Sequence, residues 1–162
     1  MTTLLLYGVA AGLAVSLMWQ TAPQAGLCAL LTKAEAEEIL GKPLAPPEQR
    51  PGGDCWYPDQ PGAGVGGDII LHVLPDRFDS KEKFHAFLMT EVAAADEGMK
   101  KAMEGTGATF QETKVEPVSE VKAPAYYADP TLFVLQGGRV LAIAASRPHA
   151  LAVAAKALPR FR

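Results

Sequence analysis

The side chains that most often carry enzymatic chemistry are few in this sequence and follow no catalytic spacing. Four serines occur, and none lies in the G-x-S-x-G pattern of a nucleophile elbow. The three histidines lack H-x-x-x-H spacing, so a metal site would need all three to meet from distant parts of the chain. These residues are Ser16, Ser80, Ser119, Ser146, His72, His85 and His149. The sequence predicts no catalytic residue, no metal site and no cofactor, because an enzyme would need His72, His85 and an aspartate to converge.

Two further patterns resemble functional motifs but have a simpler interpretation. Gly62, Gly64 and Gly67 spell G-x-G-x-x-G, but the segment leads into a β-type run rather than a helix, so it does not predict dinucleotide binding. Asp76 and Asp79 flank a strand-to-helix turn, where carboxylates commonly serve as turn and cap residues.

The two cysteines, Cys28 and Cys55, are the strongest covalent signal in the chain. An even cysteine count in an exported protein predicts one disulfide, and the alternative is two free buried thiols. The bridge would close a loop of about 28 residues and stabilise the fold by roughly 3.6 kcal/mol. The chain has no C-x-x-C pair, so it gives no support to thioredoxin-type, haem-attachment or cysteine-zinc chemistry. We expect the bridge to tie the first helix to a strand at residues 55–57.

Aromatic and apolar side chains provide two candidate binding surfaces. Trp56, Tyr57, Tyr126 and Tyr127 either pack in the core or, with Tyr57 and Tyr126 pointing outward, form a patch for a partner protein or glycan. A second candidate is an apolar pocket between a long helix and a sheet. Its lining would be Phe84, Leu88, Val92, Phe133 and Leu135.

The composition is that of an ordinary folded domain. The 162 residues carry 15 Lys and Arg against 18 Asp and Glu, for a net charge of −3, and 49% are apolar. A nucleic-acid-binding domain would show a basic face, and a disordered chain would have fewer apolar residues and more net charge.

The first part of the chain differs from the rest, because no charged residue precedes Lys33. Residues 4–19 form an unbroken apolar run that predicts either a signal peptide, cut after Ala22 or Ala25, or a retained membrane helix over residues 4–22. A lipoprotein modified at Cys28 is a third alternative, although Leu27 is larger than a lipobox prefers. We therefore expect a segment 1–27 that exports or anchors the chain, and one extracytoplasmic domain over 28–162.

The elements that must position these residues follow from local patterns. Thr32 and Glu35 predict a capping box, and Gly137-Gly138 predicts a hairpin between strands at 132–135 and 139–145. Further strands are expected at 55–57, 68–74, 109–115 and 125–128, with a long helix from about residue 80 to 104 and a short one after Pro148. The order α-β-β-α-β-β-β-β-α predicts an α+β fold with a mostly antiparallel sheet and helices on one face, preceded by the N-terminal apolar helix.

Two stretches of the chain resemble a family of bacterial cell-envelope domains of unknown function. The first is CALLTKAEAEEILGKPL with CWY about thirty residues later, and the second is VSEVKAPAYYADPTLFVLQGGRVLAIAAS with LPRF following. Members of that family are typically exported, often as lipoproteins. The resemblance implies a Cys28–Cys55 bridge and an α+β fold, and it brings no catalytic residue.

Taken with the apolar N-terminus, these features predict a non-enzymatic interaction or accessory protein at the outer face of the cytoplasmic membrane. Its partners would be the membrane, through residues 4–22 if they are retained, and another envelope protein, but not nucleic acid. The alternative function is binding of a small molecule or lipid in the apolar pocket.

Overall fold

The computed structural model describes residues 26–61 and 69–162. The predicted apolar helix over residues 4–22 and the glycine-rich segment 62–67 lie outside the described residues. In chain order the elements are η1 (Leu27–Ala29), α1 (Lys33–Leu40), β1 (Glu48–Gln49), β2 (Cys55–Tyr57), β3 (Ile69–Arg77), α2 (Lys81–Met103), β4 (Val115–Pro117), β5 (Ala125–Ala128), β6 (Thr131–Gln136), β7 (Arg139–Ala144) and α3 (Arg147–Ala157).

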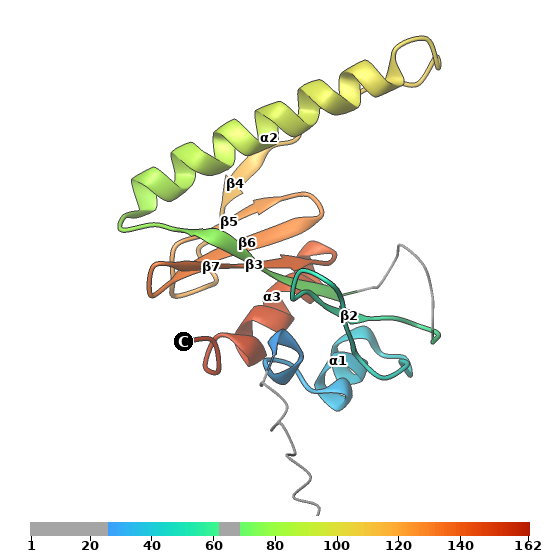
Figure 1. Cartoon of the computed structure of the whole chain (residues 1–162), viewed down its shortest axis with the longest axis vertical. Helices are drawn as coiled ribbons and strands as arrows, with labels where there is room; N and C mark the ends of the chain where they lie inside the picture. Colours follow the sequence, from blue (N-terminus) through green and yellow to red (C-terminus); the bar gives the residue numbers. More distant parts are fainter. Residues whose placement is uncertain (1–25, 62–68) are drawn as a thin grey trace, which may run out of the picture.

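The strands of the described residues form one antiparallel sheet in the order β1-β2-β3-β7-β6-β5-β4 (Figure 1). Strands β6 and β7 make the predicted hairpin around Gly137 and Gly138, whose φ angles of 59° and 78° are the positive values that a primed turn needs. Strand β7 then pairs with β3, which joins the C-terminal hairpin to the strands before the long helix.

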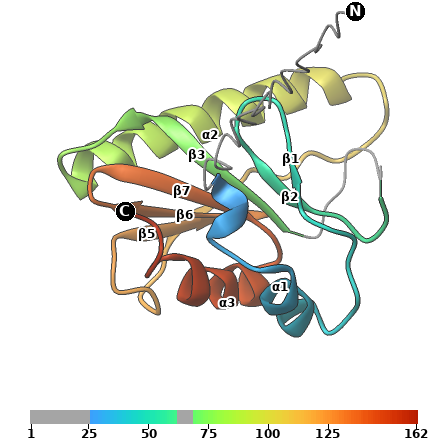
Figure 2. The ribbon, with the colours of Figure 1, turned by 60° about the horizontal axis from the view of Figure 1, so that its bottom comes forward.

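The main hydrophobic core lies on the face of the sheet that α1 and α3 cover (Figure 2). Leu71, Leu132 and Ile143 lie in one cross-strand row and are fully buried there. Helix α3 adds small side chains, Ala150, Val153 and Ala154, so its backbone packs close to the sheet.

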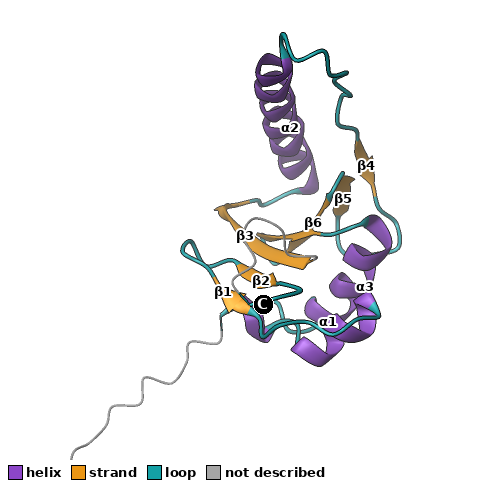
Figure 3. Ribbon diagram, turned by 90° about the vertical axis from the view of Figure 1, so that its right-hand side faces the viewer, coloured by secondary structure: helices purple, strands orange, loops and turns teal. Residues whose placement is uncertain are grey.

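Helix α2 covers the opposite face, so the prediction that the helices share one face is wrong. Figure 3 shows α2 on one side of the sheet and α1 and α3 on the other. Along β6 the side chains alternate, so Leu132 faces the main core while Phe133 and Leu135 face α2. Because β6 and β7 are apolar on both sides, each face must be covered.

The boundaries of the helices follow the predicted signals. The hydroxyl of Thr32 accepts a hydrogen bond from the amide of Glu35 at 3.2 Å, and the Glu35 carboxylate accepts one from the Thr32 amide at 2.8 Å, which completes the capping box. Gly41 ends α1 with a φ of 67°. Ser80 caps α2 through the amide of Lys83 at 3.2 Å.

Two strand predictions need correction. The strand expected at 109–115 is loop as far as residue 114, and the strand itself is the short β4, Val115–Pro117. An additional short strand, β1, extends the other edge, so the observed order contains one strand more than expected. Both edges of the sheet are thus very short, which limits pairing with strands of other chains.

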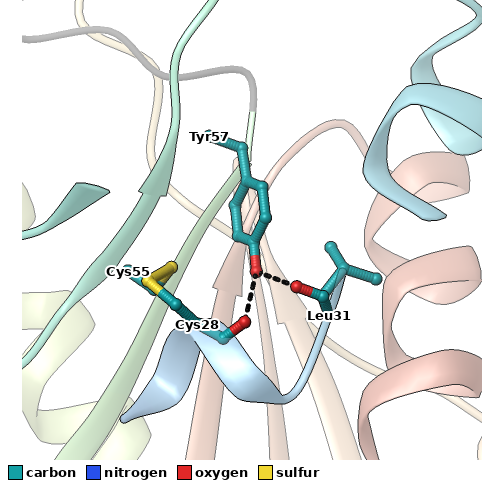
Figure 4. Close-up of a disulfide and its surroundings, with 4 residues drawn as sticks. All are labelled: Cys28, Leu31, Cys55 and Tyr57. Carbon is teal, nitrogen blue, oxygen red and sulfur yellow. Dashed lines mark hydrogen bonds between the residues drawn. A yellow bond between two sulfur atoms is a disulfide. The ribbon is translucent and has the colours of Figure 1, made fainter. Parts of the chain in front are cut away.

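The predicted disulfide is present between Cys28 and Cys55, with the Cα atoms 5.1 Å apart (Figure 4). It joins η1 to β2. The Tyr57 hydroxyl donates to the main-chain oxygen of Leu31 at 2.5 Å, beside the bridge. Because Sγ of Cys28 is bonded to Cys55, this sulfur cannot carry the thioether lipid of a lipoprotein.

Candidate functional site

Helix α2 is too long for the sheet that it covers. Its 23 residues span about 34 Å, whereas the six residues of β6 span about 20 Å. Only the first turns lie on the sheet, where Phe84 and Leu88 are 0% and 2% exposed. The second half extends past the strands (Figure 3).

The apolar side of α2 continues into this projecting half. Val92, Ala95 and Met99 follow Leu88 at spacings of four, three and four residues, so they lie on the same side of the helix. Val92 is half-buried, Ala95 is exposed, and Met99 is 56% exposed. We call these three residues the arm stripe.

The projecting half of α2 is braced by the segment that follows it. Both oxygens of the Asp96 carboxylate accept hydrogen bonds from Thr113, one from its amide at 2.8 Å and one from its hydroxyl at 2.7 Å. These bonds hold the segment between α2 and β4 beside the helix. We call residues 92–114 the arm. It presents the arm stripe on one side, with the Glu97–Lys101 ion pair at 2.7 Å on the opposite side.

The four aromatic residues predicted as a surface patch divide between the two faces of the sheet. Tyr57 and Tyr127 are 0% and 7% exposed and belong to the main core. The predicted outward orientation of Tyr57 is therefore wrong, and core packing is the correct alternative for both. Burial raises the pKa of each phenol. The Tyr127 hydroxyl donates to Asp129 and to the main-chain oxygen of Ala145, at 3.0 and 3.2 Å.

Trp56 and Tyr126 lie on the other face but far apart. Strands β3, β7 and β6 separate β2 from β5, which corresponds to about 19 Å across the sheet. The half-buried Trp56 ring lies 4.6 Å from the guanidinium carbon of Arg50. Tyr126 contacts the N-terminal part of α2, with its ring 4.8 Å from that of His85. The four aromatic side chains therefore form no common patch.

The residues predicted to line a pocket beneath α2 instead fill this space. Phe84, Leu88 and Leu135 are buried together with Val140, and Phe133 packs against them. Val92 lies one turn farther along, where α2 leaves the sheet. Side chains therefore occupy the start of the helix–sheet interface.

An apolar groove of about 640 Å³ lies instead between α3 and the segment before β5. Val121, Ala123, Leu151 and Leu158 contribute to its walls. No sequence pattern indicates this groove, because its two sides are about thirty residues apart in the chain and neither side has a periodicity typical of a cavity.

The three histidines have separate structural partners. His72 Nδ1 lies 2.5 Å from Oδ1 of Asp54, the residue before β2, and His149 Nδ1 lies 3.0 Å from Ser146 Oγ at the start of α3. His85 stacks on Tyr126. Within residues 26–61 and 69–162, no three His, Cys, Asp or Glu side chains are grouped closely enough to hold a metal ion.

Of the two aspartates predicted at the turn before α2, Asp79 lies in that turn, whereas Asp76 lies within β3. Asp79 accepts a hydrogen bond from Lys83 at 2.7 Å, and this contact lowers the pKa of its carboxyl.

No helix in the described part of the chain is both long enough and apolar enough to cross a bilayer.

Comparison of the chain with protein-family models, curated proteins and solved structures gave no match. The resemblance to cell-envelope domains therefore remains a prediction. In the geometry of the chain itself, Met99 of the arm stripe is the most exposed large apolar side chain of α2.

Proposed function

We propose that this chain is a non-enzymatic interaction or accessory domain of the cell envelope. Residues 4–22 hold it at the outer face of the cytoplasmic membrane, and the arm docks into a groove on an envelope or membrane protein. The observation that carries this proposal is the continuation of the buried apolar side of α2 into the exposed arm stripe, where Met99 is 56% exposed.

The spacing of the arm stripe supports a helix-in-groove contact. Leu88, Val92, Ala95 and Met99 repeat at four, three and four residues, which is the pattern of anchors that an apolar groove accepts. Burying this side of the arm removes the side chain of Met99 from water. The small side chain of Ala95 lets a partner surface approach the helix backbone closely.

The size of the arm favours a wrapping groove over a second copy of the same helix. The twelve residues Val92–Met103 span about 18 Å, so one helical face covers about 200 Å². A specific interface usually buries about 800 Å² on each partner. A groove that encloses the arm stripe and the two sides of the helix next to it, and leaves the Glu97 side free, comes closer to this area than face-to-face pairing of two arms does.

The position of the arm agrees with an anchored domain. Gly26, where the described chain begins, lies beside η1 at one end of the molecule, whereas the arm projects at the other end (Figure 1). A domain held through residues 4–22 would thus present the arm away from the bilayer, toward the extracytoplasmic part of a partner.

Site-specific photo-crosslinking of the full-length protein in its own cells tests the docking site. A photoreactive residue at Ala95 should give one adduct of defined mass, and the same residue at Glu97, on the opposite side of α2, should give none. Met99→Glu should abolish the Ala95 adduct without changing the amount of protein, because Met99 is exposed.

Two results would contradict this proposal. Equal crosslinking from positions 95 and 97, or an Ala95 adduct that persists with Met99→Glu, would show that the arm stripe is not the contact. An adduct with twice the mass of the chain would assign the arm to self-association. Membrane retention is tested separately by the intact mass of protein isolated from its own membranes. That mass should equal the full length less two hydrogens, whereas a mass starting near residue 23 or 26 would indicate cleavage.

The apolar groove beside α3 supports a second candidate function, binding of a small apolar ligand. Its volume of about 640 Å³ falls in the range of small-molecule sites. Titration with a fluorescent fatty acid should give saturable binding that Ala155→Trp removes by filling the groove. Ala94→Trp on the arm should leave the titration unchanged. Equal titrations for both variants would contradict binding in this groove.

A further inference from the structure

Four arginines gather at the end of the molecule where the described chain begins. Arg77 lies in β3, Arg139 in β7, and Arg160 and Arg162 follow α3. Two adjoining hollows of about 360 and 290 Å³ share Val73 and Arg139 as lining residues. We call this group the arginine cluster.

The arginine cluster is only partly neutralised. Arg160 donates two hydrogen bonds of 2.7 Å to the Glu35 carboxylate and one of 3.0 Å to the main-chain oxygen of Leu30. Arg139 donates to the main-chain oxygen of Arg162 at 2.8 Å, and its guanidinium carbon lies 5.0 Å from the centre of the Phe161 ring.

Carboxylates are scarce around the arginine cluster. Among the residues that the structure describes, no aspartate or glutamate lines the larger hollow, and Asp76 is the single one that lines the smaller. Within the described residues, neither Arg77 nor Arg162 forms an ion pair. The net charge of this end is therefore positive, although the whole chain carries −3.

The strand register places two of these arginines in direct opposition. Arg77 and Arg139 are cross-strand partners at the end of the β3–β7 ladder. Like charges in that position destabilise a sheet unless a counterion lies between them. The arrangement is thus unfavourable for the free protein and favourable for a complex with an anion.

The N-terminal tether indicates which anion can reach this site. Gly26 lines the larger hollow. If residues 4–22 cross the bilayer, as the proposed function requires, the chain from Trp19 to Gly26 spans at most about 25 Å, and from Ala22 about 14 Å. The arginine cluster then lies within reach of the lipid headgroups.

We propose that the arginine cluster binds the phosphate of an anionic phospholipid headgroup at the outer face of the membrane that anchors the chain. Guanidinium groups bind phosphate through paired N–H donors, and Arg77 and Arg139 approach the site from neighbouring strands. The contact would fix the orientation of the domain on the bilayer and keep the arm pointing away from the membrane. This inference rests on the anchoring part of the proposed function.

The test uses the full-length protein in neutral detergent micelles, titrated with phosphatidylglycerol or phosphatidylcholine. The amide NMR signals of Gly52 and Gly53, which line the larger hollow, report occupancy. Phosphatidylglycerol should shift these signals in a saturable way and phosphatidylcholine should not. Each arginine near an anionic surface strengthens binding about fivefold. The double variant Arg77→Gln with Arg162→Gln should therefore raise the phosphatidylglycerol concentration at the midpoint of the titration about 25-fold.

A matched control removes two positive charges elsewhere. Lys100 and Lys114 are exposed and belong to the arm, so Lys100→Gln with Lys114→Gln should leave the phosphatidylglycerol titration unchanged. An equal loss in this control, or no loss in the arginine variant, would overturn the site. An equal response to inorganic phosphate would overturn the lipid assignment in favour of a soluble anion.

The anchor and the headgroup site can fail independently. If the intact mass shows cleavage near residue 23 or 26, the anchoring part of the proposed function is wrong, whatever the lipid titration shows. If the mass shows the full chain and phosphatidylglycerol does not shift Gly52 and Gly53, the anchor stands and the headgroup site is wrong.

Discussion

Loss of the Cys28–Cys55 bridge should lower the free energy of unfolding by about 3.6 kcal/mol. The cysteines are 27 positions apart, so the bridge restricts a loop of 28 residues in the unfolded chain, and the loop-closure relation gives this value at 25 °C. A domain typically has about 5–15 kcal/mol of stability, so the loss is a large share of the total. The Tyr57 hydrogen bond to Leu31, next to the bridge, should weaken at the same time.

The assay is urea unfolding of the full-length protein in neutral detergent, followed by circular dichroism. Three samples should be compared: oxidised protein, the same protein with a reductant, and the variant Cys28→Ala with Cys55→Ala. The reduced protein should lose about 3–4 kcal/mol relative to the oxidised protein. The variant should match it or lose somewhat more, because Cys55 is fully buried. Reductant should not affect the variant. A loss below about 1 kcal/mol on reduction would refute this reasoning, because the unfolded chain would then gain little freedom when the bridge opens.

Three further predictions concern the packing and charges of the domain. Arg160 lowers the pKa of Glu35 from 4.5 to about 2, so ionised Glu35 stabilises the fold above pH 5 and this stability is lost as the pH falls toward 2. Because Arg160 is exposed, we expect this pair to add only about 1 kcal/mol to the free energy of unfolding at pH 7 relative to pH 3, as measured in urea. Glu35→Gln should remove that contribution. Identical pH profiles for the variant and the unchanged protein would contradict the pairing. Tyr57→Phe removes the hydroxyl that donates to the Leu31 carbonyl and should lower the free energy of unfolding in urea by about 1–3 kcal/mol. A loss of less than about 0.5 kcal/mol would show that another group replaces this hydrogen bond. Leu88→Ala should cost about 2–5 kcal/mol in urea unfolding through the cavity it leaves beneath α2, and a smaller loss would mean that α2 is loosely packed.

Features that depend on neighbouring residues could be predicted from the sequence. Thr32 and Glu35 lie three positions apart in the order that a capping box requires, and Gly137-Gly138 supplies two consecutive positive φ angles. The single pair of cysteines allows one intramolecular connection, which the structure confirms. The α+β class and the antiparallel sheet follow from such local signals, because each needs only a few consecutive residues.

The face of the sheet on which a residue lies could not be predicted in the same way. Adjacent strand residues point to opposite sides, so Trp56 and Tyr57 must separate, but the alternation alone does not tell which side holds the main core. That choice depends on the pairing of β2 with β3, and the order of the strands in the sheet separates Trp56 from Tyr126.

The arm was partly predictable. The apolar positions predicted a helix from about residue 80 to 104, and the expected strands were three to seven residues long, so a helix of that length is longer than any of these strands. The sequence pattern showed the apolar stripe of α2 but not where the sheet beneath it ends. The exposed position of Met99 therefore became clear only in the folded chain.

The sequence by itself determined the helix caps, the hairpin turn, the disulfide and the antiparallel α+β class, because local spacing and residue counts carry that information. Tertiary structure alone decided that helices cover both faces of the sheet, that Tyr57 is buried, and that Arg77, Arg139, Arg160 and Arg162 line two adjoining hollows. These last residues are distributed over more than eighty positions of the chain. Their proximity results from the pairing of β3 with β7 and the return of the chain after α3, which no short stretch of sequence specifies.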